Sequence, residues 1–186
     1  MADTKVVTGK VRLSFVSVFK RKPKNDGTEG KYELQVLVPK SDKATVKKIK
    51  AAIEEATQQG IDKYKSWGGK APKGFMNPLH DGDADDEDLE KYPEREGMYY
   101  LNARSDKKPG IVDRDCNEIL DPDEVYSGCW GRVSVNFYPF DNQSRGVGVG
   151  LNNVQKLKDD TRLGGSAASA EDDFGDGFED DDDDDF

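Results

Sequence analysis

The chain has 186 residues, a formal net charge of −10, one histidine and two cysteines. No apolar run approaches the roughly 20 residues that a membrane-spanning helix needs, and residues 1–10 lack the apolar core of a secretion signal. This composition argues against a membrane protein, a disulfide-stabilised secreted domain and a His/Cys zinc site, so we expect reduced cysteines in a cytoplasm.

Two alternating segments open the chain. Residues 6–19 alternate between apolar and polar side chains, and one phase holds Val7, Gly9, Val11, Leu13 and Phe15. This pattern predicts a long strand with one buried face. A basic, turn-rich loop follows at residues 20–27. A second strand is predicted from Tyr32 to Val38, ended by Pro39.

One amphipathic helix is predicted next, with Ser41 or Asp42 as its cap and Gly60 as its end. Its apolar positions are spaced by three and four residues: Val46, Ile49, Ile53 and Ala56. Residues 66–96 read as a flexible surface insertion. Its second half, Asp81 to Glu96, carries nine acidic side chains against Lys91 and Arg95.

Strand patterns return at residues 98–104, 131–138 and 147–151. Residues 141–144 join the last two as a hairpin loop, and Pro139 is expected to end its strand or lie at an edge. Few helices and several alternating strands predict a mainly β fold, a small five-stranded Greek-key barrel with one or two helices. We expect one domain over residues 1–163 and a disordered acidic tail over 164–186.

No catalytic constellation is recognisable, so the sequence predicts neither an enzyme nor a bound cofactor or metal. Residues 146–150, Gly-Val-Gly-Val-Gly, lack the downstream helix of a dinucleotide loop and favour sheet curvature or close backbone approach instead. A calcium loop starting at Asp83 would place Asp88 at its sixth position, where glycine is required.

Basic residues interleaved with aromatic side chains form the best candidate site. Binding single-stranded nucleic acid without sequence preference requires cations along the phosphates and flat rings for the bases. We expect Trp67 and Phe75, on a loop rich in Gly and Lys, to close over such a strand, whereas Trp130 is expected to be packed. The predicted single-stranded DNA-binding residues are Lys10, Arg12, Lys20, Arg21, Lys22, Lys24, Trp67, Phe75, Tyr100, Arg104, Lys107, Lys108, Arg132 and Tyr138.

The C-terminal segment has the opposite charge. From Gly164 onward there are eleven acidic residues and no Lys or Arg, which leaves 28 basic and 27 acidic residues in the first 163. The chain ends on Asp180, Asp181, Asp182, Asp183, Asp184, Asp185 and Phe186. Such a tail is too charged to pack in a core, so we expect it to compete with nucleic acid for the basic surface and to offer Phe186 to partner enzymes.

Two sequence blocks carry a family resemblance. Tyr126-Ser-Gly-Cys-Trp-Gly-Arg132 is followed by Gly146-Val-Gly-Val-Gly-Leu-Asn-Asn-Val-Gln155. Over about residues 5–158 the chain resembles bacteriophage single-stranded DNA-binding proteins of a family first catalogued as a domain of unknown function. The tail is similar to those of bacterial and podophage single-strand binders.

The resemblance implies an OB-fold, non-specific binding of single-stranded DNA and a homodimer that works in phage replication or recombination in the cytoplasm of the bacterial host. It also implies that the tail contacts replication or recombination proteins. One feature departs from the usual OB-fold: its helix normally lies between the third and fourth strands, whereas here it follows only two recognisable strands.

Two other functions stay open from the sequence. The protein could be an acidic DNA mimic that inhibits a host DNA-binding enzyme, although its negative charge is concentrated in one tail rather than spread over a rigid surface. It could also be a metal-dependent nuclease that uses His80, Asp81 and Asp83.

Overall fold

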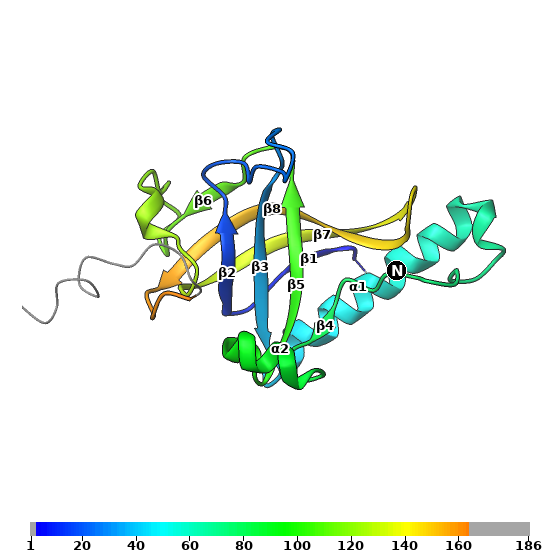
Figure 1. Ribbon diagram of the computed structural model, residues 1–186, viewed down its shortest axis with the longest axis horizontal. Coiled ribbons are helices and arrows are strands. Elements are labelled where there is room, and N and C mark those ends of the chain that lie inside the picture. Colours follow the sequence, from blue (N-terminus) through cyan, green and yellow to red (C-terminus); the bar gives the residue numbers. More distant parts are fainter. Residues whose placement is uncertain (1–2, 164–186) are drawn as a thin grey trace, which may run out of the picture.

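The computed structural model describes residues 3–163, and the predicted tail lies outside the described residues. One eight-stranded sheet dominates the fold, with the strand order β1-β7-β2-β3-β5-β8-β6 and β4 paired to β5. The strands are β1 (Lys5–Val7), β2 (Val11–Ser17), β3 (Tyr32–Pro39), β4 (His80–Asp81), β5 (Met98–Ser105), β6 (Gly110–Val112), β7 (Trp130–Asp141) and β8 (Arg145–Lys158). The prediction of a mainly β protein is confirmed (Figure 1).

Five of these strands close into a barrel. β2 pairs with β3, β3 with β5, β5 in parallel with β8, β8 with β7, and β7 with β2. One parallel pair among antiparallel ones, with the fourth barrel strand returning to the first, is the OB-fold connectivity that the sequence predicted. β1 and β6 extend the sheet beyond the barrel.

The predicted first strand is divided in two. β1 and β2 both pair with β7, and they are separated at Thr8–Lys10, where the Gly9 N–H donates to Thr45 Oγ1. The break shifts the inward phase by one residue, so Val6 is buried and Val7 is exposed. Phe15 is also exposed, because a bulge after Ser14 turns its backbone to φ 47°. The expected inward positions of Val7 and Phe15 were therefore wrong.

The helix α1 (Lys43–Lys63) begins at Asp42, whose side chain accepts from the Thr45 N–H at 3.1 Å. It lies between the second and third barrel strands rather than in the usual OB-fold position, and it packs mainly on β7. The sequence had suggested that this helix ends at Gly60, but it does not. The helix continues for three residues, because Gly60 is a buried contact point for the Trp67 ring.

The segment between α1 and β5 contains several short ordered elements. They are η1 (Lys65–Trp67), β4, α2 (Asp86–Lys91) and η2 (Pro93–Arg95), so this insertion is not a plain loop. Tyr92 lies edge-on to Phe15 with ring centroids 5.8 Å apart. Arg95 is buried and donates to Gln35 of β3 at 3.2 and 3.3 Å. These contacts hold α2 and η2 against the outer face of the sheet, at the foot of β2, β3 and β5 in Figure 1.

β7 and β8 form a long hairpin joined at residues 142–144, as predicted. Pro139 does not end β7, but it does lie at an edge, because at this position β7 pairs only with β8. The strand continues to Asp141, because Val147, opposite Pro139, donates its N–H to Met76 O instead of to β7. Gly146 lies against the backbone of Met76, which confirms that this glycine allows close backbone approach.

The core is formed by the inward faces of the barrel strands and the apolar face of α1, with Leu13, Val36, Ile49, Leu101 and Val133 among its fully buried side chains. Cys129 is buried and Cys116 exposed, and both are free thiols. Among the helices that the structure describes, none has the length and apolar character to cross a membrane.

Candidate nucleic-acid interface

Three adjoining depressions form a basic track across one face of the barrel. The first, which we call the groove, has a volume of about 350 Å³ and lies between β5 and the β7–β8 hairpin. It shares Lys31 and Arg104 with the second depression, and the second shares Pro23 with the third. The track therefore joins the β7–β8 hairpin to the basic loop between β2 and β3, across the face of β5. OB-folds bind oligonucleotides with the corresponding two loops and the strand face between them.

Tyr138 supplies an open aromatic face in the groove. Its side chain is 46% exposed and lies flat against Gly148, where a β-carbon would come within 2.6 Å of Tyr138 Cζ. A β-carbon on Gly150 would lie 3.8 Å from Cε1 of the same ring. The alternating glycines of β8 thus leave room for the ring of β7, and its opposite face is free to stack on a base.

Cations from two elements line the track. Arg104 of β5 and Lys31 lie in the groove, Lys22 and Lys24 in the second depression, and Lys20 and Arg21 in the third. Glu33 forms ion pairs with Lys22 at 3.0 Å and with Arg104 at 3.3 Å. One carboxylate therefore holds Lys22 and Arg104 in place, and a phosphate group could replace it.

The β2–β3 loop is also braced by its own basic residues. Arg21 donates to Gly30 O at 3.1 Å and lies 5.2 Å from the centroid of Tyr32. Lys108, beyond β5, lies 5.5 Å from the Phe19 ring that lines the third depression. Lys107 is exposed in the same turn. Most of the predicted binding residues are thus brought to one side of the barrel.

Tyr100 does not offer a free ring. His80 stacks on one face, with centroids 5.0 Å apart, and the Arg95 guanidinium lies 4.2 Å from the ring centroid. Arg95 also lies 4.1 Å from the Tyr92 centroid. Tyr92, Arg95, Tyr100 and His80 form a column of stacked side chains, and His80 is the member that lines the groove.

Trp67 is buried, at 3% exposure, and contacts Gly60 of α1. Its place in a loop rich in Gly and Lys had suggested that it closes over nucleic acid, but its ring packs against Tyr64 and edge-on against Phe75. Phe75 is itself partly buried against the core. In this arrangement neither ring faces the track, because the residues around η1 collapse onto the end of α1.

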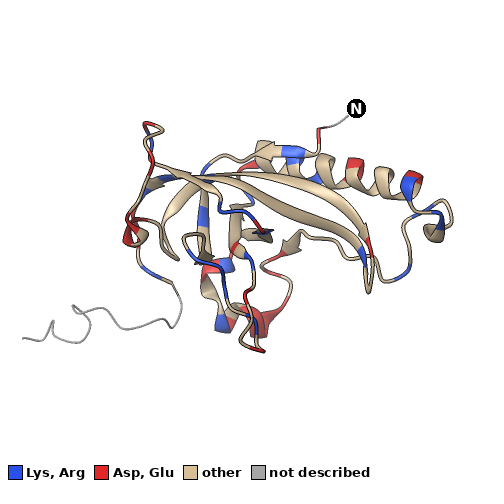
Figure 2. Cartoon of the chain, turned by 90° about the horizontal axis from the view of Figure 1, so that it is seen from above, with Lys and Arg blue, Asp and Glu red and all other residues tan. Residues whose placement is uncertain are grey.

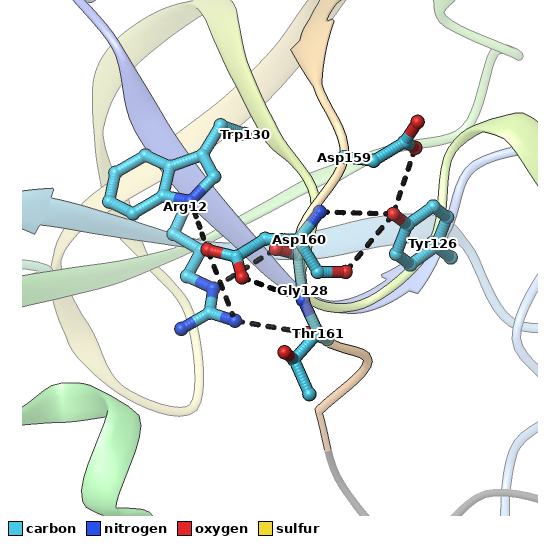
Figure 3. Close-up of polar contacts among 7 residues, drawn as sticks. All are labelled: Arg12, Tyr126, Gly128, Trp130, Asp159, Asp160 and Thr161. Carbon is cyan, nitrogen blue, oxygen red and sulfur yellow. Dashed lines mark hydrogen bonds and ion pairs between the residues drawn. The ribbon is translucent and has the colours of Figure 1, made fainter.

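Lys10 and Arg12 lie apart from the three depressions, next to the ring of Trp130. Figure 3 shows Arg12 and Trp130. Arg12 donates to Gly128 O at 3.0 Å and to Thr161 O at 2.9 Å, so its guanidinium is largely engaged with the backbone. Trp130 donates from Nε1 to Asp160 at 2.8 Å. This hydrogen bond, together with the Thr161 N–H and the charge of Arg12, lowers the pKa of the Asp160 carboxyl.

The Tyr-x-Gly-x-Trp block fastens the end of the described chain. Tyr126 Oη donates to Asp159 at 2.8 Å, and the Leu163 N–H donates to Ser127 O at 2.8 Å. Gly128 has φ +118°, and a β-carbon there would collide with Thr161 O. The block thus holds residues 159–163 beside Arg12, immediately before the predicted tail (Figure 3).

Arg132 lies elsewhere again. Its Nε donates to Thr8 O at 2.9 Å, and it lines a separate depression with Val7 and Cys116 on the outside of β1, β6 and β7. The structure therefore separates Lys10, Arg12 and Arg132 from the track, although the sequence pattern had put all three on the outward face of the predicted strands.

The acidic insertion is tied to the barrel by Lys40. Its Nζ contacts Asp81 at 2.6 Å and Asp83 at 2.7 Å, which raises the pKa of Lys40 and lowers the pKa of both carboxyls. Within residues 3–163 no three His, Cys, Asp or Glu side chains converge as metal ligands would. Acidic side chains outnumber basic ones in α2 and η2 (Figure 2).

Lys31 and His80 are among the residues of the track that were not predicted from the sequence. Lys31 directly precedes β3 and continues the outward phase of that strand. Its position between the first two depressions depends on the fold of the β2–β3 loop. His80 had been considered only as a metal ligand. A two-residue strand gives no periodic signal, so its pairing with β5 was not visible in the sequence.

A family model and a known phage protein each match nearly the whole chain. The family model described as the ssDNA-binding protein of Enterobacter phage Enc34 matches residues 4–186. Putative protein p50 of Acyrthosiphon pisum secondary endosymbiont phage 1 is 30% identical over 179 residues, which cover 90% of this chain and 91% of that protein.

Solved structures agree with this result. The single-stranded DNA-binding protein of bacteriophage Enc34 in complex with ssDNA is 29% identical, with a TM-score of 0.71 over 87% of this chain and 90% of that one. The single-stranded DNA-binding protein gp2.5 of bacteriophage T7 shares the fold at 16% identity, with a TM-score of 0.61 over 91% of this chain and 99% of that one. The family model spans nearly the whole sequence, and the chain therefore belongs to the family of the Enterobacter phage Enc34 ssDNA-binding protein.

Proposed function

We propose that this protein binds single-stranded DNA without sequence preference, and coats and protects it during phage DNA replication or recombination. The observation that carries the proposal is the basic track, in which Arg104 and Lys31 lie beside the open ring of Tyr138 and the loop cations line the two adjoining depressions. Cations along the backbone and a ring for the bases are the two requirements for this mode of binding. Family membership and the Enc34 complex with ssDNA support it.

Electrophoretic shifts on single- and double-stranded oligomers across a salt series test this function. We expect a strong preference for the single strand and a steep loss of affinity with salt, with a slope of about −0.7 per neutralised phosphate. Arg104→Ala should make the slope shallower by about 0.7. Lys48→Ala, which removes the same charge from an exposed position on α1, is the matched control and should leave the slope unchanged. Equal affinity for both oligomers would refute the proposal.

The acidic tail, residues 164–186, competes in our proposal with DNA for the cations of the barrel and, when displaced, binds replication or recombination enzymes through residues 180–186. Its charge, with eleven acids and no Lys or Arg, supports this role. The chain leaves the barrel at residues 159–163, which are fastened beside Arg12 and near Lys10 and Lys158. The last described residues before the tail therefore lie beside basic side chains.

Deleting residues 164–186 is expected to tighten binding to oligo-dT at low salt and to have less effect at high salt, where the attraction of the tail to the barrel is screened. A chain of the same length in which the tail acids are replaced by Asn and Gln is the control. It should behave like the deletion, because the competition depends on charge. Unchanged affinity at low salt after the deletion would rule out self-competition.

Three further properties belong to the same proposal. The protein acts without enzymatic activity, in the cytoplasm of the bacterial host, and as a homodimer, which light scattering in solution would check. The barrel over residues 1–163 is the DNA-binding domain and the tail a separate disordered region. The nuclease alternative loses support, because Asp81 and Asp83 are engaged by Lys40 and His80 is stacked on Tyr100.

A further inference from the structure

The strongest unassigned feature is a column of stacked side chains that ends in the groove. Arg95 is inserted between Tyr92 and Tyr100, at 4.1 and 4.2 Å from their centroids, and His80 stacks on the other side of Tyr100 at 5.0 Å with an interplanar angle of 27°. Both faces of Tyr100 are therefore occupied. His80 is exposed and is the member of the column that lines the groove.

Arg95, inside this column, is fixed to the sheet by hydrogen bonds. Arg95 is only 7% exposed and donates to Gln35 Oε1, and Gln35 Nε2 in turn donates to Asn102 Oδ1 at 3.1 Å. Tyr100 and Asn102 are on the same outward face of β5. The guanidinium that packs on the Tyr100 ring is thus held in place by hydrogen bonds to the sheet.

His80 is held from its own side as well. It pairs with Tyr100 in the β4–β5 ladder, and the next residue, Asp81, is bound by Lys40 at 2.6 Å. The following glycine, Gly82, is buried against the carbonyl oxygens of Arg95 and Met98, where no side chain would fit. A platform that is ordered before its ligand arrives loses little entropy on binding.

The surroundings of His80 fit an unpaired nucleotide. The groove places the imidazole with Asn102, Arg104, Lys31 and Tyr138, so rings, an amide and two cations face one cavity of about 350 Å³. Burial, reinforced by the charge of Arg95, lowers the pKa of His80. A lower pKa favours the uncharged imidazole, which contacts a nucleotide through its ring face rather than through an ion pair.

We propose that His80 is a base-stacking residue, and that an unpaired nucleobase in the groove stacks on the outward face of its imidazole and extends the column Tyr92–Arg95–Tyr100–His80. Lys31 and Arg104 then lie where they contact the adjacent phosphates, and Asn102 offers its amide to the base edge. The assignment rests on the proposed function, because it names the side chain on which the DNA base stacks.

Nuclear magnetic resonance tests this directly, because His80 is the only histidine of the chain. In the untagged full-length protein its Hε1 and Hδ2 signals stand alone. Adding oligo-dA should move both signals upfield, since they come to lie over the adenine ring. Saturating binding, monitored in the same sample by the broadening of the backbone signals, with both imidazole signals unmoved would overturn the proposal.

Affinity measurements give a second test. His80→Ala should weaken binding to oligo-dA about five- to tenfold, in the lower part of the range for aromatic stacking, at every salt concentration. His80→Phe should restore most of the affinity, and both variants should keep the salt slope of the unmodified protein. Thermal unfolding of the two variants shows whether each is folded at the temperature of the measurement.

The outcomes separate the two levels of the argument. If the unmodified protein binds single strands while His80→Ala binds equally well, the stacking role is overturned and the proposed function stands. A shallower salt slope without rescue by Phe also overturns stacking, because it indicates a phosphate contact. Failure of the unmodified protein to bind single strands overturns the proposed function, and the stacking role with it.

Discussion

Trp67→Ala is expected to lower the free energy of unfolding by about 3–5 kcal/mol, the usual cost of removing a buried tryptophan side chain. The ring is 3% exposed and packs against Gly60, Tyr64 and Phe75 at the end of α1. For a domain of this size the loss corresponds to a decrease in Tm of about 6–20 °C, which differential scanning calorimetry measures.

Trp67→Phe is the control for this prediction. A phenyl ring fills part of the same space, and it removes an indole N–H that is buried without a hydrogen-bond partner in the described part of the chain. The loss of stability should therefore be clearly smaller than for Ala. If Trp67→Ala left Tm unchanged and instead weakened binding to oligo-dT, the ring would be a nucleic-acid contact and its buried position would be wrong.

Tyr138→Ala is expected to have the opposite profile, with a loss of single-stranded DNA affinity of about 1–3 kcal/mol, or about 5- to 150-fold, and little change in Tm. The ring is half-exposed in the groove and supported from behind by Gly148 and Gly150. Fluorescence anisotropy with labelled oligo-dT measures the loss. Tyr138→Phe should keep most of the affinity, because stacking uses the ring and not the hydroxyl group.

Gly148→Ala provides the matched control through the same ring. A β-carbon at Gly148 would lie 2.6 Å from Tyr138 Cζ, so the substitution displaces the ring from its seat without removing it. It should weaken binding in the unmodified protein and add nothing in the Tyr138→Ala background, since contacting residues are coupled. Equal losses in both backgrounds would show that Gly148 acts on the hairpin itself and not through Tyr138.

The elements of the barrel were largely predictable, because strand and helix periods are local properties of the chain. β3, β5 and the β7–β8 hairpin agree with their predicted ranges to within a few residues at most ends, and α1 begins at the predicted cap Asp42. The basic character of the β2–β3 loop also follows from composition alone. Even the unusual position of the helix, after only two barrel strands, was visible in the order of the patterns.

Errors arose where a distant contact replaced a local rule. Gly60 reads as a helix end, but Trp67 packs on it and the helix continues. Val7 is in the predicted inward phase, but the break at Gly9, held by Thr45 from α1, shifts the register. These contacts join residues that the local pattern does not connect.

The sequence by itself determined that this is a mainly β, OB-fold-like protein with separated basic and acidic segments and enough rings and cations to bind a single strand. Only the tertiary structure decided which side chains are available for binding. Trp67 is covered because it packs on Gly60, whereas Tyr138 stays open. Tyr100 is covered because Arg95 reaches Gln35 across 60 residues and β4 brings the exposed His80 onto β5. Exposure is set by long-range packing, which composition and periodicity do not specify.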